Sequence, residues 1–157
     1  MRVVHAFTVF ADYFQFIVQD EDSDDDFAAL WTEEALSAQT AFGRQAVCPG
    51  TLRNVRVPVE IIVSSDAPQV DLDHVDHAVE GSLALSSGRV VVMGCTEYFP
   101  DAQRFSVEPG TYRALAVMTG VATIQNEWDP ADDKYVLYLW PGTARPMKLL
   151  KHWKSAA

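Results

Sequence analysis

Residues 86–119 contain the feature that most limits the fold: two apolar, β-branched runs, each preceded by a turn signal. Ser87-Gly88 precedes the run at 90–93, and Pro109-Gly110 precedes the run at 115–118. Proline presets φ within a turn and glycine supplies a positive φ, so these pairs separate strands. Tyr112 follows the second turn, where its ring can pack inside while its hydroxyl bonds a backbone group, as in the tyrosine corner of β-sandwiches. The segment predicts antiparallel sheet.

Other apolar runs recur along the chain at the spacing of an all-β domain. Residues 3–19 predict two strands that turn at Ala11-Asp12, or one strand bent by a bulge, with Phe14 among the core residues. Pro58 cannot donate to a ladder, so the strand at 56–63 is predicted to be an edge strand or to have a bulge. It is the second of two strands predicted within residues 46–65, with a turn at 48–51. Further strands are predicted at 77–85, 90–95, 105–107 and 134–140, the last central because both its faces are apolar. We therefore expect a mainly β protein, an antiparallel β-sandwich of roughly eight or nine strands.

One short helix is expected within residues 27–41, with Thr32 as its N-cap and Trp31 packing on Leu36 as a hydrophobic staple. Residues 1–142 form a single predicted domain, and residues 143–157 form a basic tail. The tail could form a short amphipathic helix, which would be marginal alone. Packing on the acidic body, or partial disorder, is the simpler expectation.

The charge is strongly asymmetric. The 157 residues include 22 acidic and 12 basic ones, for a formal charge of -10. The tail holds 4 of the 12 basic residues and no acid, which leaves 8 basic and 22 acidic residues, or -14, in residues 1–142. Such a body repels nucleic acid and attracts basic proteins or cations.

Residues 20–26 place six carboxylates in seven positions, a density that predicts a solvated loop. The loop could be plain, could dock a basic protein, or could hold a cation, although the spacing of an EF-hand is absent. Its candidate contact residues are Asp22, Asp24, Asp25 and Asp26, with Trp128 as an aromatic anchor.

Two further groups of residues could bind a metal or act as a nucleophile. Asp71, Asp73, His74 and His77 offer oxygen and imidazole ligands for a metal such as zinc, but in no established spacing, so a polar loop is the alternative. Cys95 ends an apolar run, where a cysteine is more often a small core residue than a nucleophile. We expect no catalytic residues and no cofactor.

The sequence shows no secretory signal, so we expect a cytoplasmic protein whose two cysteines are reduced thiols. It has no run of 18 apolar residues, so we expect no membrane span.

Four motifs occur in order along the chain: 7–10 (Phe-Thr-Val-Phe), 31–35 (Trp-Thr-x-Glu-Ala), 51–59 (Thr-x-Arg-Asn, then Val-Pro-Val) and 109–112 (Pro-Gly-Thr-Tyr). In this order they resemble the competence protein J family, small bacterial proteins described as inhibitors of a nuclease involved in DNA uptake. The likeness is best over residues 7–63, while the 20–26 loop and the basic tail depart from it. The resemblance implies a protein that binds a nuclease and is not itself an enzyme.

Two functions therefore remain open. The first is an acidic, non-enzymatic binding protein, an inhibitor or immunity-like partner of a basic protein such as a nuclease. The second is a metal-binding module or metal-dependent enzyme that uses the cluster at residues 71–77.

Overall fold

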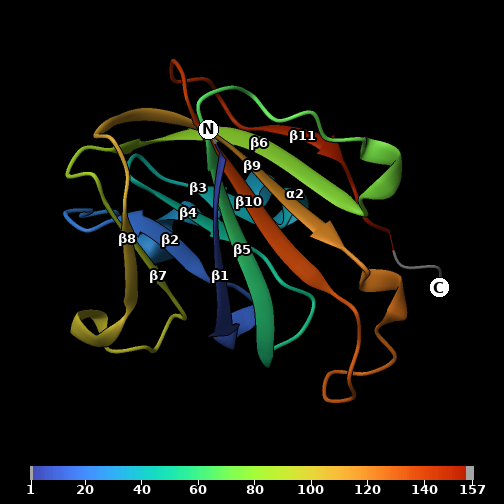
Figure 1. Ribbon diagram of the computed structural model, residues 1–157. Coiled ribbons are helices and arrows are strands. Elements are labelled where there is room, and N and C mark those ends of the chain that lie inside the picture. The colour runs from blue at the N-terminus through green and yellow to red at the C-terminus, as the bar shows by residue number, and fades with distance from the viewer. Residues whose placement is uncertain (1, 155–157) are drawn as a thin grey trace.

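The computed structural model describes residues 2–154 as two facing β-sheets of eleven strands (Figure 1). The larger sheet has six strands in the order β1 (Arg2–Phe10), β5 (Arg56–Ser64), β10 (Lys134–Pro141), β9 (Gly110–Thr119), β6 (His77–Leu85) and β11 (Lys148–Lys151). The smaller sheet has five in the order β3 (Thr40–Phe42), β4 (Ala46–Pro49), β2 (Ile17–Asp20), β7 (Arg89–Met93) and β8 (Gln103–Ser106). The predicted mainly β sandwich is confirmed, with more strands than expected.

The helical segments of the described residues are short. They are α1 (Phe27–Leu30), α2 (Glu33–Ala38) and the 3-10 turns η1 (Asp12–Phe14), η2 (Leu72–His74), η3 (Phe99–Asp101) and η4 (Val121–Thr123). None of these segments is long and apolar enough to cross a membrane. The predicted helix at 27–41 is thus divided, because two side chains each cap a separate turn. Asp26 accepts from the backbone N–H groups that begin α1, and Thr32 accepts from Ala35 to begin α2, which confirms the Thr32 cap.

The main core lies between the sheets and consists of inward-facing residues of both. Phe16, Leu137 and Tyr135 are among its largest fully buried side chains. Burying each large apolar side chain contributes about 1.5–3 kcal/mol, so this layer dominates the stability. A second cluster covers the outer face of the larger sheet, where Val70 and Leu72 of the 65–76 loop pack against it.

The turn before β9 forms as the sequence predicts. The Tyr112 side chain is buried, and its hydroxyl donates to the Glu108 carbonyl oxygen over 2.6 Å. This geometry confirms the tyrosine-corner prediction and fixes the entry of β9 into the sheet.

Two local predictions are wrong. Phe14 is 48% exposed, because the chain turns at η1 and gives Phe14 a φ of 59°, which a strand cannot have. Strand β5 is interior, between β1 and β10, and the β10 ladder begins at Val59, one residue past Pro58. The proline therefore leaves that ladder intact.

Residues 143–154 of the tail contain a strand and no helix. Residues of β11 pair antiparallel with β6, and Lys148 lies opposite Glu80. An open sheet edge satisfies the backbone groups of a short segment that would make a marginal helix. The expectation that the tail packs on the body is correct for the residues described, while residues 155–157 lie outside them.

Candidate functional site

The acidic 20–26 loop is folded around its own carboxylates. Asp20 is fully buried, and its side chain accepts from the backbone N–H of Asp22 (3.0 Å) and from the N–H (3.0 Å) and hydroxyl (2.8 Å) of Ser87. Asp25 accepts from the N–H groups of Arg44 (3.0 Å) and Gln45 (2.8 Å). These carboxylates tie the loop to the turn between β3 and β4 and to the turn between β6 and β7.

The remaining acids of this loop are not equally available. Asp26 caps α1, and Glu21 forms ion pairs with Arg89 and Arg104. Asp22 and Asp24 are exposed. The predicted contact residues Asp22, Asp24, Asp25 and Asp26 therefore divide into two that reach solvent freely and two that hold the local backbone.

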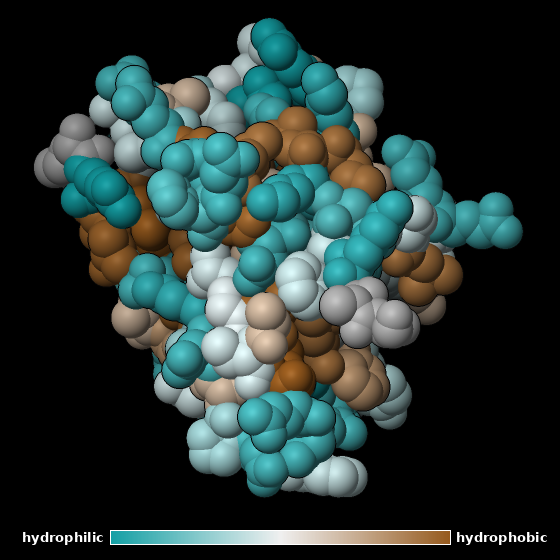
Figure 2. All heavy atoms as spheres, turned by 90° about the vertical axis from the view of Figure 1, so that its right-hand side faces the viewer, coloured by the Kyte–Doolittle hydropathy of each residue, from teal (hydrophilic) through white to brown (hydrophobic). Residues whose placement is uncertain are grey.

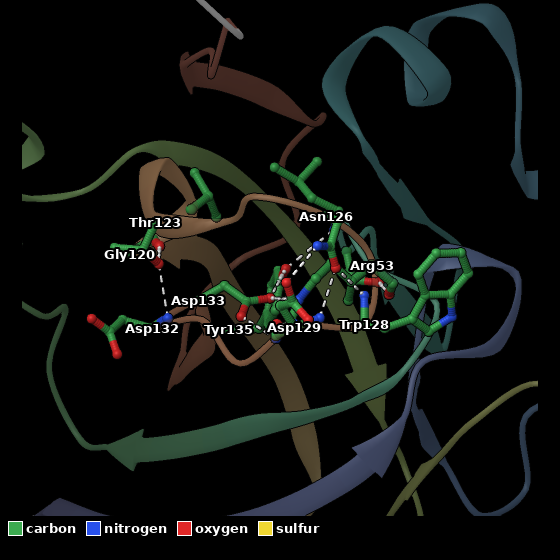
Figure 3. A network of polar contacts seen from close by, with 12 residues as sticks. Arg53, Gly120, Thr123, Asn126, Trp128, Asp129, Asp132, Asp133 and Tyr135 are labelled. Carbon is green, nitrogen blue, oxygen red and sulfur yellow. Dashed lines mark hydrogen bonds and ion pairs between the residues drawn. The ribbon is translucent and has the colours of Figure 1, made fainter.

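Trp128, the predicted anchor, lies on the segment between β9 and β10 and is 79% exposed. The base of this segment is a buried ion pair in which Arg53 donates to both carboxylate oxygens of Asp133, at 3.1 and 2.5 Å. Arg53 also donates to the Asp129 carbonyl oxygen over 2.8 Å, and the Tyr135 hydroxyl donates to Asp133 over 2.8 Å (Figure 3). Burial raises the pKa of Tyr135, so its hydroxyl keeps its proton.

The turn that carries Trp128 is itself held by side chains. The Asn126 side-chain oxygen accepts from the backbone N–H groups of Trp128 (2.9 Å) and Asp129 (2.7 Å). At the base, Gly120 has a φ of 69°, and a Cβ there would lie 2.1 Å from the Asp132 carbonyl oxygen. Glycine is therefore required at this closing point. Figure 3 shows the indole pointing away from the network.

The 20–26 loop and Trp128 lie at opposite ends of the sandwich. The loop follows the end of β2 and contacts the turn before β7, whereas the Trp128 segment joins the end of β9 to the start of β10. In Figure 1 the loop projects at the left and the 121–133 segment at the lower right. The face seen from the right of that view has hydrophilic side chains spread among hydrophobic areas (Figure 2). The predicted contact residues therefore do not form one patch.

The metal candidates at residues 71–77 do not come together as one set of ligands. Asp71 caps η2 by accepting from the Asp73 backbone N–H (2.9 Å) and pairs with the His74 ring over 2.9 Å. His77 is buried, donates from Nε2 to the Ala38 carbonyl oxygen, and accepts at Nδ1 from the Trp153 N–H. Both ring nitrogens are engaged in the neutral form, and burial lowers the pKa of His77. Among residues 2–154, no three His, Cys, Asp or Glu side chains are grouped as metal ligands.

Both cysteines are free thiols. Burial raises the pKa of Cys48 to about 12 and that of Cys95 to about 11. Because the thiolate is the reactive form, neither group is an activated nucleophile at neutral pH.

The structure adds residues that the sequence did not single out. Tyr13 (71% exposed) and Phe14 both have a φ of 59°, a left-handed conformation that is unusual for aromatic residues. Alternation of apolar residues assigned Phe14 to a strand interior, and Asp12 in the turn was the only signal against it. Tyr98, on the 94–102 loop, is 69% exposed and had no sequence signal.

Two facing layers of mostly antiparallel sheet, connected by short helices, define a β-sandwich. Among solved structures, the chain is similar to ComJ, inhibitor of the DNA degrading activity of NucA, from Bacillus subtilis, with a TM-score of 0.68 and 16% identity over 90% of this chain and 99% of that one.

It is also similar to the protein of crocagin biosynthetic gene J, with a TM-score of 0.63 and 20% identity over 91% of this chain and 99% of that one. No family model and no curated protein sequence matches the chain. The fold resemblance predicted from four short motifs is thus confirmed at the level of structure.

Proposed function

We propose that this protein is an inhibitor of a nuclease of the NucA type, acting by binding and without catalysis of its own. The observation that carries the proposal is the fold shared with ComJ over 90% of this chain and 99% of ComJ. A fold shared over nearly the whole of both chains is compatible with the same mode of action, inhibition by binding. The surface residues would then determine which nuclease is bound.

The charge of the molecule supports this proposal. Nucleases bind DNA phosphates through basic grooves, and residues 1–142 hold 8 basic against 22 acidic residues. An acidic protein is attracted to such a groove and can exclude the DNA from it. The inhibitor then needs no reactive group, in keeping with the raised pKa values of both thiols.

The test is inhibition of DNA degradation by purified Bacillus subtilis NucA, with calorimetric titration to measure the dissociation constant in the absence of DNA. We expect a stoichiometric complex and loss of DNA degradation. Raising NaCl from about 50 mM to about 300 mM should weaken the complex at least several-fold, because salt screens exposed charges. Full DNA degradation at a large molar excess of the protein, with no heat of binding at either salt concentration, would overturn the proposal.

A further inference from the structure

One end of the sandwich holds every exposed Phe, Tyr and Trp side chain of residues 2–154. They are Phe10 at the end of β1, Tyr13 and Phe14 in η1, Tyr98 on the 94–102 loop, and Trp128. We call this set, with the loops at 11–16, 50–55, 94–102 and 120–133, the aromatic end. Isolated apolar residues are normal on a surface, but five aromatic side chains at one end are not.

Hydrogen bonds connect these loops into one continuous band. The Asp12 carboxylate accepts from the backbone N–H groups of Cys95 (2.7 Å) and Thr96 (3.0 Å), which joins η1 to the 94–102 loop. The Thr51 N–H donates to the Phe14 carbonyl oxygen over 2.8 Å, and Arg53, two residues on, holds Asp129. The four loops therefore form a single surface supported from below by the sheets.

The aromatic end is also acidic. Six carboxylates on these loops are exposed or partly exposed: Asp12, Glu97, Asp101, Glu127, Asp129 and Asp132. They outnumber the neighbouring bases, which are the exposed Arg56 and the partly exposed Arg104 and Lys134. Arg53 and Asp133 neutralise one another in the interior. Carboxylates attract Arg and Lys side chains, and the faces of Tyr and Trp rings bind the same cations.

Two features indicate that the surface is held ready for binding. The backbone of the turn that carries Trp128 is fixed by Asn126 and by the hydrogen bond from Arg53 to the Asp129 carbonyl oxygen. This backbone is therefore already ordered before a partner binds. Tyr13 and Phe14 keep left-handed backbones, each of which costs about 1–3 kcal/mol and persists where the surroundings enforce it. Strain of this kind concentrates at functional sites, and preorganised aromatic anchors bind at low entropic cost.

From these observations we infer that the aromatic end is the surface that binds the nuclease, with Trp128 as its main anchor on the 120–133 segment and Tyr13 and Tyr98 as further anchors on the other loops. The partner surface that fits is rich in Arg and Lys, as in a phosphate-binding groove. The acidic 20–26 loop, at the opposite end, stays outside the contact. This inference rests on the proposed function and specifies where the inhibitor meets its target.

The experiment compares variants by calorimetry against Bacillus subtilis NucA, with the melting temperature of each variant as the check on folding. Trp128→Ala should raise the dissociation constant at least about 30-fold, the ratio expected for a binding hot spot. Trp128→Phe, which keeps a smaller ring, should lie between Trp128→Ala and the wild type. Tyr13→Ala with Tyr98→Ala should weaken binding by about tenfold or more.

A matched pair of double variants tests the charges, since each removes two exposed carboxylates and changes the net charge equally. Asp101→Asn with Asp132→Asn, at the aromatic end, should weaken binding about three- to tenfold, and less at high salt. Asp22→Asn with Asp24→Asn, in the opposite loop, should stay within about twofold of the wild type.

The outcomes separate the two proposals. If the wild type binds NucA but Trp128→Ala binds equally well, or if Asp22→Asn with Asp24→Asn is the more damaging pair, the aromatic end is not the contact and the inhibitor function stands. If the wild type neither binds nor inhibits NucA, the proposed function fails, and this assignment of its surface fails with it.

Discussion

The 20–26 loop and the 120–133 segment are both acidic connections, yet they use their carboxylates in opposite ways. In the 20–26 loop, Asp20 and Asp25 accept backbone N–H groups from distant turns, and Glu21 pairs with two arginines. In the 120–133 segment, one buried carboxylate, Asp133, pairs with Arg53 beneath a turn that the Asn126 side chain holds, and the side chain of Trp128 is left exposed.

The comparison shows that a dense run of acids need not be a binding surface. Carboxylates packed into seven residues repel one another unless they find donors, and here the fold supplies the donors. In the 120–133 segment, the desolvation of charged groups is confined to the buried Arg53–Asp133 pair, and the Trp128 side chain stays exposed. A carboxylate is therefore available to a partner only if it is not already hydrogen-bonded or ion-paired within the fold.

The largest expected effect is loss of the buried pair beneath Trp128. Asp133→Asn should destabilise the protein by about 3–5 kcal/mol, because it leaves the buried Arg53 guanidinium without its counter-charge. Urea unfolding monitored by circular dichroism measures this change. Glu60→Gln, which breaks the half-exposed pair with Lys134, is the control and should cost no more than about 1 kcal/mol. Equal costs for the two variants would contradict the distinction.

The next effect tests whether the 20–26 loop is structural. Asp20→Asn should cost about 1–3 kcal/mol, because a buried acceptor of three hydrogen bonds is replaced by an amide that presents N–H groups to some of the same donors. Asp24→Asn, on the exposed side of the same loop, should change stability by less than about 0.5 kcal/mol. If the two variants unfold at the same urea concentration, the loop is not organised by Asp20.

Sequence patterns predicted much of the fold because the relevant signals are local. Alternation of apolar residues identified the strands at 77–85 and 134–140, and the Pro109-Gly110 turn predicted the Tyr112 corner. The interior place of β5 depends on parallel pairing with β10, in which Tyr135 lies opposite Val59, 76 residues earlier in the sequence. No local pattern predicts such a pairing.

The candidate site was harder to predict from the sequence, because its contacts join residues that are far apart in the chain. Trp128 was identified as an aromatic in an irregular acidic segment, but its support comes from Arg53, 80 residues from Asp133. The engagement of Asp20 by Ser87 joins residues 67 apart. The left-handed turn at Tyr13 is set by contacts of η1 with other loops, whereas the local alternation favoured a strand.

A smaller effect concerns the turn that presents Trp128. Asn126→Ala should cost about 0.5–1.5 kcal/mol and speed hydrogen exchange at the Trp128 and Asp129 amides, because both lose their acceptor. Gln125→Ala, an exposed neighbour, is the control and should leave both amides protected. Unchanged exchange in Asn126→Ala would show that the turn is held without this side chain and would weaken the contrast with the 20–26 loop.

The smallest effect is a pH dependence confined to the 20–26 loop. A hydrogen bond from Arg89, followed by the charges of Arg89 and Arg104, lowers the pKa of Glu21 below its ordinary 4.5. The unfolded chain then binds a proton at higher pH than the folded one, so the stability from Glu21 is complete above pH 4.5 and is lost as the pH falls through the lower folded value. Melting temperatures of the wild type and Glu21→Gln should therefore differ at pH 7 and converge as the pH falls below the lowered pKa of the folded state. A difference that widens on acidification would mean that Glu21 is held protonated in the fold, and that the loop keeps a repulsive charge cluster after all.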